Sequence, residues 1–324
     1  MNQIALGIDI AKDTFAVCLV KAPKPISGSF TNDPKGYGLL SRWLAKHQAD
    51  CVHACMEATG RYWEKLAFYL HQAGHRVSVV NPARIHSYAQ SQLSRNKTDA
   101  LDAELIARFC QREEPPLWTP PPTEVHELQA MTRHLDALIA NRGQETNRLQ
   151  SGIPSDQVRK LIEEHLAFLD TQIASLKARI QAHIDSHPSL KADRDLLESI
   201  KGIGEATAAK LLGDNIQSFS DTKSLAAYAG LSPMLGQSGS SVRRQTRISK
   251  KGLGSLRKAL YWPAISAMRH NPIVRRLAER LKERGKPKKV IIVAAMRKLL
   301  CLALGVLKSG VPFRADYAPA PEPA

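Results

Sequence analysis

IALGIDIAKDTFAVCLV, residues 4–20, is the stretch that decides the fold of the first part of the chain. Its apolar and β-branched residues alternate loosely, and the polar pair Lys12 and Asp13 interrupts them. This pattern predicts a strand, a tight turn and a second strand. After it, three helical patterns (36–47, 62–73 and 99–111) alternate with two apolar segments (51–56 and 77–80). Such an order predicts an α/β domain.

Four carboxylates lie where this domain would place an active site. Asp9 lies within the first apolar strand and Glu57 closes another, although a buried acid is costly unless it is paired or bound to a metal. Asp99 and Asp102 are three residues apart at the start of a helix, so both project from one face. Hard divalent cations such as Mg²⁺ prefer oxygen ligands of this kind. The set therefore predicts Mg²⁺-dependent chemistry on phosphodiesters.

Each acid also has a simpler explanation when it is taken alone. A GID strand opens sugar kinases and actin-like ATPases as well, Asp99 can stabilise a helix N-terminus, and Asp102 can be a solvated charge. The joint set, together with a basic second half, favours the metal site over these explanations. An actin-like ATPase is disfavoured, because no second glycine-rich phosphate-binding motif follows in order.

The charge of the chain indicates a polyanionic partner. Among 324 residues, 46 are Lys or Arg and 30 are Asp or Glu, which gives a formal net charge of +16. From 241 to 314 there are 20 Lys or Arg against two acids, Glu279 and Glu283. Such a surplus attracts nucleic acid, and an anionic membrane surface is the rival partner. No continuous apolar run approaches the roughly 20 residues of a membrane span, and residues 1–15 lack the pattern of a signal peptide. We therefore expect a cytoplasmic protein with no membrane partner.

The five cysteines, Cys18, Cys51, Cys55, Cys110 and Cys301, indicate reduced core thiols. Their number is odd, and they are scattered through apolar stretches. Cys51 and Cys55 have no second ligand pair near them, so a zinc site is disfavoured.

The middle of the chain reads as helical. Prolines at 115–122 close the first domain, 1–122. A helical segment, 123–189, is broken near 152–154, and its second half carries a seam of apolar residues with mostly 4-3 spacing: Ile162, Leu166, Leu169, Ile173, Leu176, Ile180 and Ile184. This seam predicts a coiled coil and self-association, and the alternative is an amphipathic helix packed on its own domain. A mainly α domain, 190–314, and a disordered tail, 315–324, complete the chain.

The segment SIKGIG, 199–204, lies between two helical stretches and resembles a helix-hairpin-helix. Its glycines permit a tight turn whose backbone amides can bind a phosphate without reading sequence. Lys201, Gly202 and Gly204 are the expected contacts, and the alternative is a plain turn between helices.

A glycine- and serine-rich loop, 236–241, precedes a strongly basic region that we expect to be helical. Arg243, Arg244, Arg247, Lys250 and Lys251 follow it directly, and a further basic run extends from 275 to 289. Serines in such loops are usually flexible turn residues. Beside arginines that hold a phosphate, a serine can also attack a phosphodiester and stay covalently attached. The basic residues are expected to contact nucleic-acid backbone.

With these motifs in place, the sequence resembles the DEDD transposases of the insertion-sequence one-ten family, also called bridge-RNA-guided recombinases. The likeness spans nearly the whole chain except its tail. It rests on GIDIAK at 7–12, EATG at 57–60, VNP at 80–82, RNKTDALDA at 95–103, GIG at 202–204, AGLSP at 229–233, SGSS at 238–241 and LKSGVPF at 307–313.

The resemblance implies a RuvC-like, ribonuclease-H-type N-terminal domain, a coiled coil and a C-terminal transposase domain. It places the four acids of the family on Asp9, Glu57, Asp99 and Asp102, with Mg²⁺ as cofactor. Its nucleophile falls on Ser238, with Ser240 and Ser241 close by. It also implies a composite site shared between subunits, a dimer of dimers on donor and target DNA duplexes, and a structured guide RNA that pairs with both. A bacterial, nucleoid-associated location follows.

Two other functions fit some of the same residues. A hydrolytic junction resolvase or nuclease would use the four acids and water, and would cleave fully without Ser238. An architectural RNA- or DNA-binding protein would keep its function after Asp9 and Asp102 are both replaced by Asn.

Overall fold

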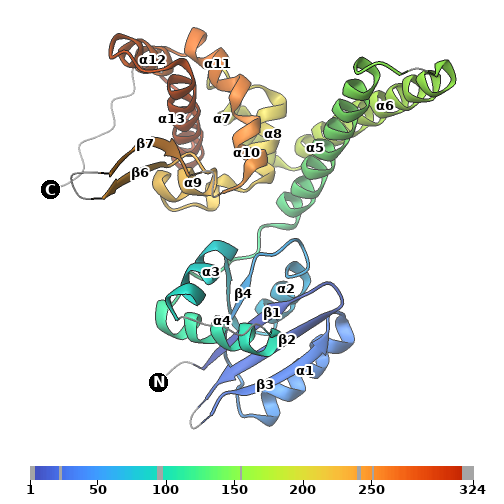
Figure 1. Ribbon diagram of the computed structural model, residues 1–324, viewed down its shortest axis with the longest axis vertical. Coiled ribbons are helices and arrows are strands. Elements are labelled where there is room, and N and C mark those ends of the chain that lie inside the picture. The colour runs from blue at the N-terminus through green and yellow to red at the C-terminus, as the bar shows by residue number, and fades with distance from the viewer. Residues whose placement is uncertain are drawn as a thin grey trace. The chain divides into compact units, whose positions relative to one another are not determined.

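The computed structural model describes residues 4–21, 24–92, 98–153, 155–238, 242–249 and 252–315, with backbone only at 235–238 and 242–247. The chain forms two compact units, Met1–Pro120 and Pro121–Ala324, here called unit 1 and unit 2 (Figure 1). The helical segment and the C-terminal region expected from the sequence pack together in unit 2.

Unit 1 is built on a five-stranded sheet of order β3-β2-β1-β4-β5. The strands are β1 (Ala5–Ile10), β2 (Thr14–Val20), β3 (Ile26–Thr31), β4 (His53–Glu57) and β5 (Arg76–Val80). The first three pair antiparallel, and β4 and β5 run parallel to β1. The hairpin expected at 4–20 is confirmed, with Ala5 opposite Val20 and Ile10 opposite Phe15.

Helices cover both faces of this sheet. They are α1 (Pro34–Lys46), α2 (Glu64–Gln72), α3 (Pro82–Ser91) and α4 (Asp99–Glu113). Leu6, Ile8 and Met56 share one apolar core with residues of α1 and α2, whereas α4 packs on the opposite face. The α/β domain predicted from the alternating pattern is therefore confirmed.

The proline-rich segment after α4 is held along the sheet. The backbone amide of Trp118 donates to the Val77 carbonyl at 2.7 Å, and Ser78 Oγ donates to the carbonyls of Pro115 and Pro116, both at 2.9 Å. The Trp118 ring makes edge contacts with Trp63 and Phe68. The segment thus belongs to unit 1 up to its boundary at Pro120.

Unit 2 begins with a long helical hairpin of α5 (Thr123–Gln150) and α6 (Asp156–Ser186). Five of the seven seam residues are buried, namely Ile162, Leu169, Ile173, Ile180 and Ile184. α6 packs along α5 of the same chain, and Ile180 and Ile184 share a core with Val125 and Leu128. The seam thus has a partner within the chain, so the seam no longer argues for a second chain.

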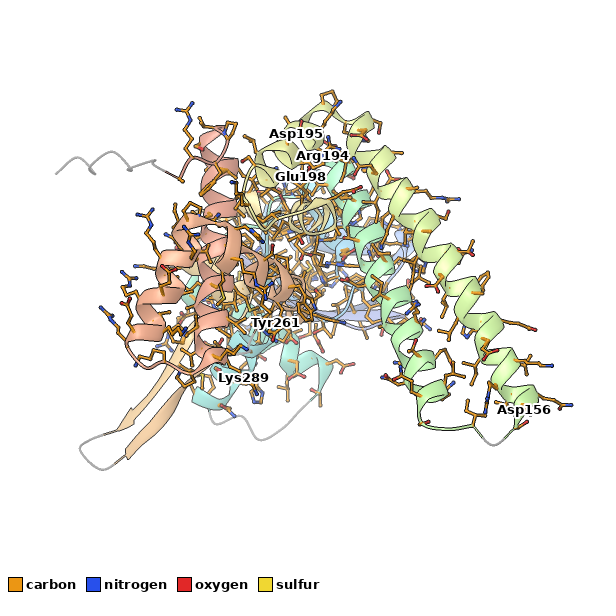
Figure 2. All side chains as sticks on the ribbon, turned by 90° about the horizontal axis from the view of Figure 1, so that it is seen from above. Asp156, Arg194, Asp195, Glu198, Tyr261 and Lys289 are labelled. Carbon is orange, nitrogen blue, oxygen red and sulfur yellow. The ribbon has the colours of Figure 1, made fainter. Side chains whose placement is uncertain are left out.

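The rest of unit 2 is mainly helical, as expected. It contains α7 (Pro188–Glu198), α8 (Glu205–Gly213), η1 (Ile216–Ser218), α9 (Thr222–Tyr228), α10 (Gly254–Ala259), α11 (Tyr261–His270), α12 (Pro272–Glu283) and α13 (Lys288–Ser309). Arg194 of α7 bridges Asp185 of α6 (2.6 Å) and its neighbour Asp195 (2.9 Å), which ties the hairpin to these helices. Figure 2 shows Arg194 and Asp195 at this base and Asp156 at the far tip of α6.

α13 supplies much of the core of unit 2. Ile292, Met296, Leu299, Leu300 and Leu304 are buried against α7, α9 and α11. By length and composition alone this helix could also cross a membrane, and half of its most apolar window is buried inside the unit. Because core helices pass the same test, the packing explains its apolar character.

One part of the basic region differs from the helical expectation. A two-stranded antiparallel ribbon, β6 (Pro233–Ser238) and β7 (Val242–Ile248), includes part of the expected loop and the arginines after it. Arg243, Arg244 and Arg247 therefore lie on a strand. β-branched Val242, Thr246 and Ile248 at alternating positions favour this strand.

Candidate active site

Asp9 and Glu57 lie at the carboxyl ends of two adjacent parallel strands. Ile8 of β1 is in register with Met56 of β4, so the next residues, Asp9 and Glu57, lie beside one another. Ile8 and Met56 face the core with α1 and α2, and side chains alternate along a strand. Asp9 and Glu57, both half-buried, therefore belong to the opposite face, which α4 covers.

α4 approaches this face closely at Gly7, two residues before Asp9. A side-chain Cβ at Gly7 would collide with the backbone of Ala103 and Ala107 in α4. Asp99 and Asp102 lie one helical turn before Ala103 and Ile106, which are buried against the sheet. Both acids therefore continue the sheet-facing side of α4, in its first turn. Thr98 caps this helix, because its Oγ1 accepts from the Leu101 amide at 3.3 Å.

The residues after Glu57 shape its surroundings. Thr59 Oγ1 donates to Glu57 Oε1 at 2.8 Å, and Gly60 takes a positive φ of 58°. The EATG motif thus orients the carboxylate and turns the chain away from the sheet. The structure brings all four acids to one side of the sheet, although no three His, Cys, Asp or Glu side chains among the described residues are close enough to hold a metal. The donor type fits Mg²⁺, and the described geometry is not that of a closed site.

Behind the acids, two thiols fill the space between β4 and α4. Cys55 and Cys110 are buried and hydrogen-bonded to each other, and Cys110 Sγ lies 3.5 Å from the His53 carbonyl. The hydrogen bond with Cys110 and burial raise the pKa of Cys55, so its thiol stays protonated. The expected core location is confirmed for Cys18, Cys55 and Cys110, whereas Cys51 is exposed and Cys301 is half-buried.

Ser238 is the last residue of β6. Its Cα is in register with Val242, and Arg243 follows opposite Gln237. Arg244 and Arg247 lie further along the same strand, opposite Gly236 and Met234. The backbone thus places Ser238 and these three arginines on one ribbon. Ser240, Ser241, Lys250 and Lys251 lie outside the described residues.

The SIKGIG turn joins α7 and α8, as expected. Gly202 takes φ +110°, and a Cβ there would lie 2.7 Å from the Cβ of Ala267 in α11. The Phe313 amide donates to Ser199 Oγ at 2.8 Å, so the GVPF motif near the C-terminus holds the same turn. Lys201 is exposed beside it. The assignment of the SIKGIG turn and its two helices to the helix-hairpin-helix class stays a prediction.

An ion cluster that the sequence did not predict joins α5 to α8, with Lys210 and Asp214 buried and Asp136 partly exposed. Lys210 Nζ lies 3.0 Å from Asp136 Oδ2 and 3.5 Å from Asp214 Oδ1. Burial raises the pKa of Asp214, and it raises that of nearby Tyr228 to about 12. Lys210 and Asp214 are i, i+4 partners, but sequence spacing gives no sign that α5 would bury them.

Comparisons with known proteins cover both units. Residues 6–154 match the DEDD family from IS110 elements, described as "Transposase", and residues 194–279 match the "Transposase IS116/IS110/IS902 family". The chain is similar to the "Pilin gene-inverting protein" of Moraxella bovis, with 37% identity over 97% of this chain and 98% of that protein. It is also similar to the "Transposase for insertion sequence element IS1328" of Yersinia enterocolitica, with 24% identity over 80% and 82% of the two chains. The corresponding IS1111A protein of Coxiella burnetii shows 27% identity over 82% and 78%. The family match at residues 6–154 spans all four acids, and the family match at residues 194–279 spans Ser238.

Proposed function

We propose a function from the premise that this chain belongs to the IS110 family of transposases. It is a transposase, an enzyme that recombines DNA for an insertion sequence. In our proposal it cuts and rejoins two DNA duplexes through a phosphoserine intermediate. The acids of unit 1 and Ser238 of unit 2 act on the same phosphodiester.

The placement of Asp9 and Glu57 carries this proposal. Two carboxylates stand at the ends of adjacent parallel strands, and two more stand in the first turn of the helix that covers the same side of the sheet. Ligands of α/β sheets commonly bind beyond the carboxyl ends of the strands. The sheet order, with an antiparallel hairpin extended by parallel strands, supports a RuvC-like, ribonuclease-H-type domain.

Asp9, Glu57, Asp99 and Asp102 would hold Mg²⁺, because carboxylate oxygens are the donors that this ion prefers. Bound there, Mg²⁺ would polarise the scissile phosphate and stabilise charge on the leaving oxygen. The chain itself provides placement: β1, β4 and α4 fix the donors on packed elements. Thr59 holds the Glu57 carboxylate by a hydrogen bond.

Ser238 supplies the nucleophile. Its Oγ loses a proton to solvent and forms a bond to phosphorus, while the bond from phosphorus to the leaving DNA oxygen breaks and that oxygen takes up a proton. The hydroxyl freed on one duplex then attacks the phosphoserine of the other and releases Ser238. The number of phosphate ester bonds is conserved, so no external energy source is needed.

The same proposal names the partners. Donor and target duplexes bind the basic surface of unit 2, with Lys201, Gly202, Gly204, Arg243, Arg244, Arg247, Lys250 and Lys251 as contacts to phosphates. A structured guide RNA pairs with both duplexes and supplies the sequence specificity. The chain works in the cytoplasm as a dimer, or as a tetramer formed from two dimers, in which the acids of one subunit complete the site of another.

A hydrolytic nuclease is the second candidate, because all four acids lie in unit 1, which does not contain Ser238. Water would then replace the serine, and the product would be cut and never rejoined. The two candidates differ in one observable, which is a covalent bond between protein and DNA.

The test uses full-length protein, the flanking RNA of the element and an end-labelled donor duplex, separated on a denaturing gel. Ser238→Ala should abolish the protein–DNA adduct, whereas the neighbouring variants Ser240→Ala and Ser241→Ala should retain it. An adduct that persists in Ser238→Ala places the nucleophile elsewhere. Cleavage that continues without any adduct would favour the hydrolytic candidate.

A further inference from the structure

An aromatic pair stands exposed at the start of α11. The Trp262 side chain is 73% exposed, more than any other large apolar side chain among the described residues, and Tyr261 beside it is 40% exposed. Their rings lie 5.4 Å apart at an angle of 84°. An isolated apolar residue on a surface is ordinary, so the neighbours of this tryptophan decide what it means.

Two of its exposed neighbours are cationic. Lys258, Ser266 and Arg269 lie four residues before, four after and seven after Trp262, and all three are exposed. Ser266 and Arg269 belong to α11, and their spacing puts them on the same helical face as the indole ring, whereas Lys258 belongs to α10, which ends just before α11 begins. From 222 to 278 the chain contains no Asp or Glu. The exposed indole ring thus has one exposed cation before it on α10 and one after it on α11, in a long stretch without acids.

The opposite face of α11 is firmly packed. Ala264 and Ala267 are fully buried, and the SIKGIG turn rests on Ala267 through Gly202. α11 also packs on α12 and α13. In Figure 2 the labelled Tyr261 lies at the same end of these helices as Lys289, which belongs to an exposed run with Lys286 and Lys288. The ring is therefore presented on a rigid support next to further positive charge.

We propose that Trp262 is a stacking platform for an unpaired nucleobase, with Lys258 and Arg269 holding the flanking phosphates. Every base has a π face, and stacking on aromatic side chains binds single strands with little sequence preference. Bases inside a duplex are already stacked and cannot reach the ring. An apolar protein partner would bury the ring equally well but has no need of the flanking cations. The inference rests on the proposed function only in requiring a nucleic-acid partner.

The test measures binding of the full chain to a labelled 12-nucleotide single strand by fluorescence anisotropy at fixed salt. Trp262→Leu keeps an apolar side chain and removes the π face, so the Kd should rise about five- to 100-fold. Trp262→Phe should lose less. Phe168→Leu, a matched change at a 57% exposed aromatic on α6, should leave the Kd unchanged. DNA and RNA single strands show which source binds, and either one supports the proposal.

A duplex of the same sequence should bind Trp262→Leu as well as it binds the natural protein. The proposal is overturned if Trp262→Leu binds single strands normally, or if duplex binding falls by the same factor. It is also overturned if the substitution changes the oligomeric state in sedimentation velocity, because the ring would then be a subunit contact. Adduct formation at Ser238 is measured separately, so failure of the platform is distinct from failure of the recombination mechanism.

Discussion

The acid-bearing face of unit 1 and the serine-bearing ribbon of unit 2 are held in place in different ways. In unit 1 the acids stand on two central strands and on a helix that touches one of those strands through Gly7. In unit 2, Ser238 stands at the end of a strand whose one partner among the described residues is β7. A two-stranded ribbon has little stability of its own, so its position depends on the helices around it. Close packing within unit 1 thus fixes the position of the acids, whereas the position of Ser238 depends on how the rest of unit 2 holds the ribbon.

The two units also differ in charge. Up to Pro120 the chain has 14 Lys and Arg against 11 Asp and Glu, and after it 32 against 19. Unit 1 therefore contributes carboxylates on a nearly balanced background, and unit 2 contributes the cations that attract nucleic acid. Under the proposed mechanism neither unit carries the whole reaction, so damage to either should stop strand exchange.

The largest effect is expected at Asp9. Asp9→Asn keeps the size of the side chain and removes its charge, so the rate of strand exchange should fall about 10³-fold or more, which corresponds to several kcal/mol of lost stabilisation. Asp13→Asn, an exposed acid in the turn of the same hairpin, is the matched control and should keep full activity. A gel assay of recombined product measures both. Equal rates for the two variants would remove the acids from the mechanism.

The next largest effect is expected at Lys210, which pairs with Asp136 and Asp214 inside unit 2. Lys210→Met leaves Asp214 buried without its nearest cation, and breaking a buried pair in this way costs about 3 kcal/mol or more. Urea unfolding at pH 7 measures the loss, and Lys177→Met, at an exposed position of α6, should change little.

Acid should partly restore the Lys210→Met variant. The pKa of Asp214 is raised in the folded state, so protonation of this carboxyl favours folding. The penalty is therefore present at neutral pH and shrinks as the pH falls through the folded pKa. A penalty that stays constant with pH would show that the buried charge is not its cause.

The smallest effect tests the close approach in unit 1. Gly7→Ala forces α4 away from β1, which should destabilise the protein by about 1–3 kcal/mol and lower activity although no charged group is lost. Gly38→Ala is the control, because a Cβ there meets open space within α1. It should be neutral or slightly stabilising in thermal unfolding. Normal activity in Gly7→Ala would mean that the acids tolerate a displaced helix.

Much of unit 1 could be predicted because its elements follow clear periodicities. The strand at 26–31 is absent from the sequence prediction, because Ser27, Gly28 and Ser29 are typical of loops and the strand lies at the sheet edge. The helix α3 is also absent from the sequence prediction, which assigns no helix between 77–80 and 99–111. The Asn81 side chain in fact accepts from the Ala83 amide, and proline is favoured in the first helical turn.

The limits in unit 2 are of another kind. Periodicity at Ile162, Leu169 and Ile173 identifies a buried face but not the helix that buries it, and that helix belongs to the same chain. The helix expected across the arginines at 243–247 is a strand in the structure, and their β-branched neighbours favour that strand. Contacts such as Gly202 with Ala267, or Lys210 with Asp136, join distant segments, and no local pattern records them.

The most direct test of the shared site mixes two inactive proteins, Asp9→Asn and Ser238→Ala, in equal amounts on the donor and target duplexes. Each protein lacks one half of the site. If acids of one subunit serve the serine of another, a covalent protein–DNA adduct should form, and a size tag should locate it on the Asp9→Asn protein. No adduct in the mixture, while the natural protein forms one, would contradict the account.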